Sequence, residues 1–214
     1  RQVCTPSVAI SIPMSTAFTR PIRESCRKLG ERLAEWVGAF IDRDPAARTA
    51  WEVLTCYPGV HALVLHRLAH WLWNKGRKDF AYYLQSRSSG EFQCDIHPAA
   101  RIGRGIMFDH GTGIVIGETA EIGKDCVLFH RVTLGGTGKH AGKRHPTLGN
   151  NVLVGTNATL LGPITVGDNV KIGAEAVIIM HDVPSNSTVV GAPGRVVKLN
   201  DERVHLKLEK TREP

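Results

Sequence analysis

The sequence predicts an α+β protein in which an N-terminal α-helical region precedes a parallel β-helix. Apolar residues recur at helical spacings up to about residue 90. From Ile96 onward they recur every six residues, a period that fits no helix face and is the signature of hexapeptide repeats. The glycine-rich, basic stretch GGTGKHAGKRHPT interrupts this period after Leu134. It has no large apolar residue, so we expect it to leave the coil as a loop over about 135–147.

The composition is that of an ordinary globular chain. It has 214 residues, 42% of them hydrophobic and 22% charged. No apolar run approaches the roughly 18 residues of a membrane span, so we expect no membrane partner. The net charge of +7 would suit nucleic acid, but the basic residues are scattered, so we expect no nucleic-acid partner. A phosphate-bearing small ligand would use the same positive field. Five cysteines without a C-x-x-C pair favour a reducing compartment, and we expect a cytoplasmic protein.

Changes in pattern divide the chain into four parts. The first 23 residues contain no acid, and Met14 resembles a natural start, so residues 1–13 are interpreted as an extension. We expect a disordered extension over 1–19, a helical domain over 20–91, the β-helix over 92–197 and a charged C-terminal tail over 198–214.

Several helices are expected before the repeats. The spacing of apolar residues predicts one helix over 22–40, and DRDPAARTAWEVL restarts a helix with Asp44 as N-cap and Pro45 at the first helical position. The stretch GVHALVLHRLAHWLWNKG predicts another that ends near Gly76, and residues 78–88 predict one more.

Three histidines lie on one apolar helix, at spacings of five and four residues. They could bind a metal, but packing beside the neighbouring tryptophans Trp71 and Trp73 is the favoured interpretation. The three are His61, His66 and His70.

The six-residue period predicts which side chains point into the β-helix. Stacked coils would bury these residues in continuous columns, with each coil about 4.8 Å above the last. The period slips by two residues between Phe108 and Ile116. The inward positions are 96, 102, 108, 116, 122, 128, 134, 148, 154, 160, 166, 172 and 178.

A β-helix interior is too narrow for a ligand, so a site must lie on outer faces and on the loop. A second subunit alongside would complete a cleft, and a trimer with three clefts is the symmetric solution. His110 lies two residues past an inward position and should project outward, next to Asp109. Asp95 precedes it by about one coil, and its carboxylate could accept the second N–H of the imidazole and make His110 a better base.

These stretches resemble the short bacterial type of serine O-acetyltransferase, a family of hexapeptide-repeat acetyltransferases. The resemblance rests on DIHPAARIGRGIMFDHGTGIVIGETAEIG, VTLGGTGK, KRHPTLG and VVGAPGRVV. It implies a left-handed β-helix and transfer of the acetyl group of acetyl-CoA to the hydroxyl of L-serine, the first step of cysteine biosynthesis. Acetyl-CoA would be a co-substrate, with no tightly bound cofactor and no metal.

The resemblance also implies a role for individual residues. His110 would be the general base and Asp95 its orienting partner. Asp44 and Asp109 would hold the substrate ammonium, while Arg144, with His145 beside it, would bind the carboxylate. Thr156 stands where the family has alanine, and His130 and Arg131 replace small or amide residues. The residues that would contact acetyl-CoA are Gly136, Thr137, Thr156, Ala174 and, at a phosphate, Arg195.

Further implications concern assembly and partners. We expect a homotrimer, with pairing of trimers into a hexamer left open, and cysteine as a competitive inhibitor. Family members dock a C-terminal peptide ending in isoleucine into O-acetylserine sulfhydrylase. This sequence ends in VHLKLEKTREP, so we predict no tight complex with that enzyme.

Three other functions fit parts of the pattern. Another small hydroxyl compound, such as homoserine or a sugar, could be the acceptor. A zinc site of the carbonic anhydrase type could use His110, His140 and His145, but it has no use for Asp109 or Arg144. A non-catalytic scaffold would keep the coils without needing His110 and Asp95 together.

Overall fold

The computed structural model describes residues 34, 37–138 and 141–210. The chain divides into two compact units, 1–35 and 36–214, and the fold described below is that of the second. The expected extension and most of the first expected helix lie outside the described residues. The end of that helix is present, because residues 37–43 are helical.

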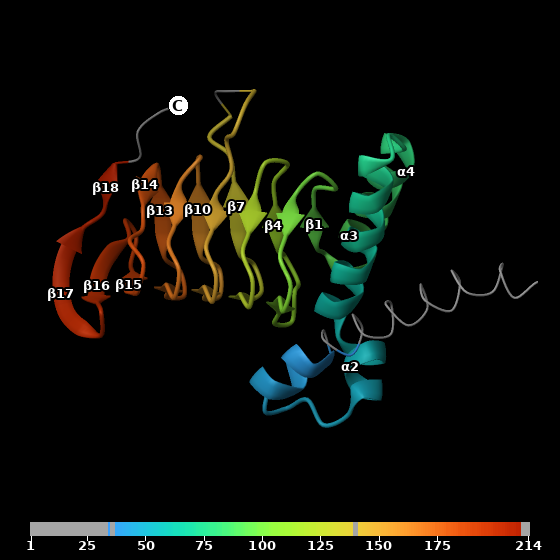
Figure 1. The fold of residues 1–214 in the computed structure, drawn as a ribbon, viewed down its shortest axis with the longest axis horizontal. Helices are drawn as coiled ribbons and strands as arrows, with labels where there is room; N and C mark the ends of the chain where they lie inside the picture. Colours follow the sequence, from blue (N-terminus) through green and yellow to red (C-terminus); the bar gives the residue numbers. More distant parts are fainter. Residues whose placement is uncertain (1–33, 35–36, 139–140, 211–214) are drawn as a thin grey trace, which may run out of the picture. The chain divides into compact units, whose positions relative to one another are not determined.

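Three further helices precede the strands (Figure 1). Helix α2 spans Ala50–Cys56, α3 spans Pro58–Asn74 and α4 spans Lys78–Phe92. Proline occupies the first turn of α3, and Gly76 follows the helix with a φ of +75°, a conformation that suits glycine. Helices α3 and α4 pack on each other, and α4 also contacts the first strand. The helices expected from 59 to 76 and from 78 to 88 are therefore confirmed.

Asp44 does not cap a helix, so that prediction is wrong. Helix α2 begins only at Ala50, where the Thr49 side chain accepts a hydrogen bond from the Glu52 N–H at 3.2 Å. The carboxylate of Asp44 instead closes a turn, accepting from the Ala46 N–H at 2.8 Å. Thr49 and Glu52 form the T-x-x-E pattern of a capping box, which was the stronger start signal.

The repeats form a parallel β-helix with three sheets. Sheet A has the order β1-β4-β7-β10-β13, sheet B the order β11-β8-β5-β2, and sheet C continues from β3 through β6, β9 and β12 to β15. Sheet A comprises Asp95–Ile96, Val115–Ile116, Thr133–Gly135, Thr159–Leu161 and Val177–Ile179. Sheet B comprises Arg101–Ile102, Glu121–Ile122, Thr147–Leu148 and Thr165–Val166. The sheet C strands are Met107–Phe108, Val127–Leu128, Leu153–Val154, Lys171–Ile172 and Ser187–Val190.

The predicted inward residues form the core. Every position of the six-residue period, from Ile96 to Ile178, is buried in one hydrophobic cluster. The smaller residues two places earlier, such as Ala120 and Ala158, are buried in the same cluster. Burial of this continuous aliphatic column supplies the main favourable term for folding of the coils.

Two coils are longer than their neighbours. In each, the extra residues lie in a corner next to a strand of sheet A, before β4 in one coil and after β7 in the other. Asp95 pairs with Val115, 20 residues later, whereas Val115 pairs with Thr133 after 18. The two extra residues lie between β3 and β4, in the corner that carries His110. Thr133 pairs with Thr159 after 26 residues, and the excess forms the loop between β7 and β8, which leaves the coil as expected (Figure 1).

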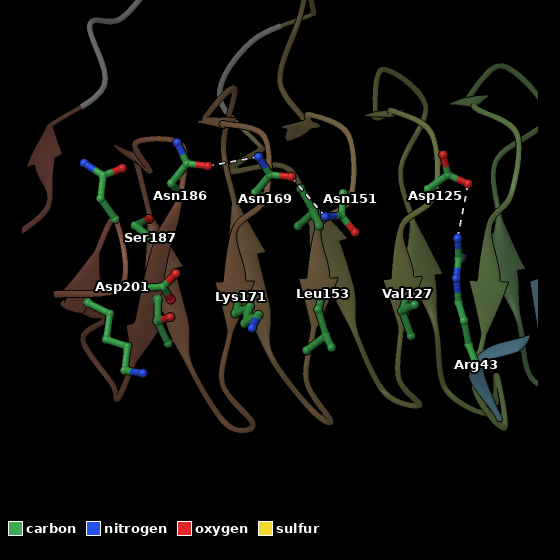
Figure 2. A pocket seen from close by; sticks show the side chains of 14 residues that line it. Arg43, Asp125, Val127, Asn151, Leu153, Asn169, Lys171, Asn186, Ser187 and Asp201 are labelled. Atoms are coloured by element: carbon green, nitrogen blue, oxygen red, sulfur yellow. Dashed lines mark hydrogen bonds and ion pairs between the residues drawn. The ribbon is translucent and has the colours of Figure 1, made fainter. Parts of the chain in front are cut away.

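An asparagine ladder lines the corner between sheets B and C. Asn151 donates to Asn169, and Asn169 to Asn186, each at 2.9 Å (Figure 2). All three have φ between +54° and +58°, the left-handed region that asparagine tolerates. Beside the ladder lies a groove of about 780 Å³ over sheet C, which ends at the Arg43–Asp125 ion pair. None of the site residues predicted from the sequence lines this groove.

The C-terminal tail is folded as far as residue 210. Strands β16 (Arg195–Leu199) and β17 (Glu202–Lys207) reverse direction and extend sheet C as antiparallel strands. Strand β18 (Glu209–Lys210) pairs with β14 (His181–Asp182). Within the described chain, no helix is both long enough and apolar enough to span a bilayer.

The three helical histidines have separate contacts, and no hydrogen bond or ring contact joins them to Trp71 or Trp73 among the described residues. His61 Nε2 lies 2.7 Å from the Leu54 carbonyl oxygen, and His70 Nδ1 lies 2.7 Å from that of Pro98. His66 is only 3% exposed, and neither ring nitrogen has a hydrogen-bond partner in the described part of the chain. No group of three metal-ligating side chains occurs among residues 37–138 and 141–210.

His66 makes stability depend on pH. Burial, together with the charge of Arg67, lowers its pKa from 6.5 to about 3. The unfolded chain therefore binds a proton below pH 6.5 that the folded chain excludes, and stability falls as the pH drops. We expect a loss of about 2 kcal/mol in the free energy of unfolding between pH 7 and pH 5. Urea unfolding at both pH values measures this decrease in unfolding free energy. The decrease should be about 2 kcal/mol smaller in His66→Leu than in wild type. It should be the same as in wild type in His205→Leu, an exposed control. Equal losses in the wild type and His66→Leu would contradict the prediction.

Candidate active site

The predicted site residues lie mainly at two corners of the coil, one before and one after each strand of sheet A. We call the corner between sheets C and A the base corner, because it carries His110. We call the corner between sheets A and B the loop corner, because the extruded loop rejoins the coil there. Among the described residues, no hydrogen bond or ion pair joins Asp109 or His110 to Arg144 or His145.

His110 points away from the coil at the base corner. It follows β3 with a φ of +57°, and its side chain is 78% exposed. Its Nε2 lies 3.8 Å from Asp109 Oδ1, and its ring meets the His130 ring edge-on at 6.0 Å. An exposed imidazole beside a carboxylate can take a proton from a bound hydroxyl compound.

Asp44 is hydrogen-bonded to Tyr57. The Tyr57 hydroxyl donates to Asp44 Oδ2 at 2.9 Å. Burial and this hydrogen bond, with the negative charge of Asp109 adding to them, raise the pKa of Tyr57 to about 12. The part of Asp44 and Asp109 in holding the substrate ammonium stays a prediction. Tyr57 was not predicted, because a lone tyrosine between two helices gives no pattern.

Asp95 is held by the helical region. Gln85 of α4 donates from Nε2 to Asp95 Oδ1 at 2.6 Å. Asp95 lies on β1, opposite Val115 on the strand that follows the His110 corner. The expected hydrogen bond between Asp95 and His110 is not formed in the described chain. Such bonds often close only when substrate is bound, so the orienting role of Asp95 stays a prediction.

At the loop corner, Arg144 is held by an acid. Arg144 donates from NH2 to Glu118 Oε2 at 2.5 Å. This hydrogen bond lowers the pKa of Glu118, so its carboxylate remains charged at neutral pH. Glu118 was not predicted as a site residue, although it lies in the stretch GIVIGETAEIG.

His145 is buried beside Arg144. Its ring lies over Gly117, where an added Cβ would come within 2.0 Å of the imidazole. Burial, and then the positive charge of Arg144, lower the pKa of His145. Gly136 flanks the same ring, since a Cβ there would lie 3.3 Å from Nε2. Thr137 follows Gly136 in the loop, so these two predicted acetyl-CoA contacts lie at the loop corner.

The remaining predicted acetyl-CoA contacts belong to the base corner. Hydrogen bonds between coils place four residues in one column along the axis. His130 Nε2 lies 3.3 Å from Thr156 Oγ1, which links two of its members. The column consists of Thr112, His130, Thr156 and Ala174, and the ring of His110 contacts that of His130.

Arg195 begins β16 and lines a pocket against β13, the strand that follows Ala174. The pocket has a volume of about 560 Å³, with an apolar floor that includes Ile179 and Pro193. Lys207 of β17 adds a second positive charge. An apolar floor with cationic groups suits an aromatic base that carries phosphates. Lys207 was missed because the tail was not expected to fold back.

Comparison with known proteins identifies relatives over most of the chain. Residues 145–179 match the family model described as bacterial transferase hexapeptide (six repeats). A serine acetyltransferase of Synechococcus elongatus is 55% identical over 165 residues, which cover 77% of this chain and 67% of the relative.

Solved structures agree with this match. Serine acetyltransferase from Brucella abortus in complex with coenzyme A has a TM-score of 0.77 and 48% identity, covering 83% of this chain and 70% of that one. Soybean serine acetyltransferase complexed with serine also has a TM-score of 0.77, with 47% identity, covering 83% and 72%. The similarity to these two structures supports a left-handed β-helix.

Proposed function

The chain belongs to the serine acetyltransferase family, and we propose that His110 is the general base in its transfer of acetyl from acetyl-CoA to L-serine. The reaction is the first step of cysteine biosynthesis, with acetyl-CoA as co-substrate. The observation that carries the proposal is the exposed imidazole of His110 beside the acid Asp109, which suits the ammonium group of an amino-acid substrate. A serine hydroxyl is a weak nucleophile at neutral pH and needs such a base.

Two subunits would complete each site. Asp109, an acid that suits the serine ammonium, lies at the base corner, while Arg144 and His145, which suit its carboxylate, lie at the loop corner. In one chain the two corners lie on opposite sides of sheet A, at the two ends of its strands. We therefore propose that the base corner of one subunit faces the loop corner of the next. Three subunits in a ring would give three equivalent clefts.

Acetyl-CoA would lie along the base corner. Its thioester would reach His110, and its pantetheine arm would pass Thr156 and Ala174. The nucleotide end would reach the pocket of Arg195 and Lys207, while Gly136 and Thr137 would be supplied by the neighbouring subunit's loop corner. We also propose a cytoplasmic location, with the free thiols of Cys56, Cys94 and Cys126 in support.

An acceptor panel tests the function. With acetyl-CoA and a thiol-detecting reagent, we expect CoA release with L-serine to exceed that with homoserine or a galactoside by at least about 100-fold in kcat/KM. Faster CoA release with another acceptor would show that serine is not the preferred substrate.

Cysteine should inhibit the enzyme by competing with serine. It places sulfur where serine has oxygen, so in the same assay it should raise the apparent KM for serine and leave kcat unchanged. Inhibition that persists at saturating serine would place cysteine outside the cleft.

A further inference from the structure

Thr119 holds three consecutive residues at the end of the extruded loop. Its Oγ1 accepts hydrogen bonds from the backbone N–H groups of Arg144 at 3.0 Å and His145 at 3.1 Å. Its carbonyl oxygen accepts one from Lys143 Nζ at 2.6 Å. The loop therefore rejoins the coil in a position set by one residue.

The contacts to the His145 ring determine which nitrogen carries the proton. The Thr119 backbone N–H donates to His145 Nδ1 at 3.2 Å, and an amide N–H cannot accept, so Nδ1 must hold a lone pair. The Thr119 hydroxyl lies 2.9 Å from the same nitrogen. Its lone pairs already face two N–H donors, so its hydrogen is free to point at Nδ1. The neutral ring therefore carries its proton on Nε2.

Together with Arg144, this ring offers only hydrogen-bond donors. The Arg144 guanidinium has no acceptor, and the Nε2–H of His145 lies beside Gly136 at the start of the loop. Burial and the nearby charges of Arg144 and Lys143 disfavour a protonated His145, while Glu118 acts in the opposite direction. A pair of donors without an acceptor suits a carboxylate.

We infer that Thr119 is a positioning residue that fixes His145 as an Nε2–H donor, so that His145 and Arg144 bind the carboxylate of the amino-acid substrate. This inference rests on the proposed function. It assigns His145 to binding and excludes it as a base through Nε2, which already carries a proton.

The hydroxyl of Thr119 can be removed without changing the shape of its side chain. Thr119→Val keeps the backbone N–H and the branched side chain, and Thr119→Ser keeps the hydroxyl. We expect Thr119→Val to raise the KM for serine about 10-fold, with kcat and the KM for acetyl-CoA within about 2-fold of wild type. Thr119→Ser should restore a KM close to that of wild type. A normal serine KM in Thr119→Val, or an equal rise in Thr119→Ser, would overturn the role of the hydroxyl.

The tautomer can be read without substrate. In the full chain with ¹⁵N-labelled histidine at pH 7, we expect an unprotonated Nδ1 and a protonated Nε2 for His145, whose signals are assigned by their loss in His145→Asn. A proton on Nδ1 would overturn the inference, and this measurement decides even if Thr119→Val fails to fold. Absence of serine-dependent CoA release in a wild type with the expected tautomer would reject the proposed function instead.

Discussion

Replacing His110 with alanine should lower turnover by roughly 10²- to 10⁴-fold, the usual contribution of a positioned general base. The imidazole is 78% exposed, and its contacts are Asp109 at 3.8 Å and the edge of the His130 ring, so the fold should be unaffected. Steady-state kinetics at saturating serine and acetyl-CoA measure the loss. Equal unfolding midpoints for wild type and variant would attribute it to chemistry rather than stability.

Two further variants sharpen this test. His205→Ala removes an exposed histidine of β17, outside both corners, and should keep full turnover. Asp95→Asn should lose less than His110→Ala, because it removes an orienting group and leaves the base in place. Near-normal turnover in His110→Ala would show that another group takes the proton.

Mixing two inactive variants should restore activity if each cleft is shared between subunits. A His110→Ala chain has an intact loop corner, and an Arg144→Ala chain has an intact base corner. Any trimer that contains both chains has one wild-type cleft. Equal mixing places both kinds in about three quarters of the trimers, so about a quarter of wild-type activity should return. Refolding the chains together and assaying at low serine concentration measures the recovery.

A pair of variants from one corner provides the control. His110→Ala and Asp109→Asn both damage the base corner, so a mixture of these chains contains no intact cleft and should stay inactive. Recovery with this pair, or no recovery with the first pair, would contradict a site formed by one corner from each of two subunits. A monomeric mass by light scattering for an active enzyme would contradict it as well.

The coils could be predicted because one physical requirement repeats along the chain. Each coil must place an aliphatic residue inward on every side, and Ile96, Leu134 and Ile178 all obey that period and are buried. Its interruptions also carried information. The slip before Ile116 is the enlarged corner of His110, and the gap after Leu134 is the extruded loop.

The sequence was less informative where one side chain has several possible partners. Asp44 before a proline resembles a helix cap, but its two oxygens bind a turn N–H and the Tyr57 hydroxyl instead. Asp95 precedes His110 by nearly one coil, yet Gln85 reaches it from another element. Thr119 lies 25 residues before Arg144, and only the return of the loop brings them together. These contacts depend on the path of the chain, which local spacing does not encode.

The reversal of the chain after β15 limits how molecules can associate. A parallel sheet that simply stopped would expose unpaired N–H and C=O groups to strands of other molecules. In sheet C, two antiparallel strands cover that position, and the outermost, β17, carries charged residues such as Glu202, Arg203 and Lys207. Charged edge strands resist further strand addition. Growth end to end into fibres is thereby disfavoured along this sheet, which suits the closed ring of subunits that we propose.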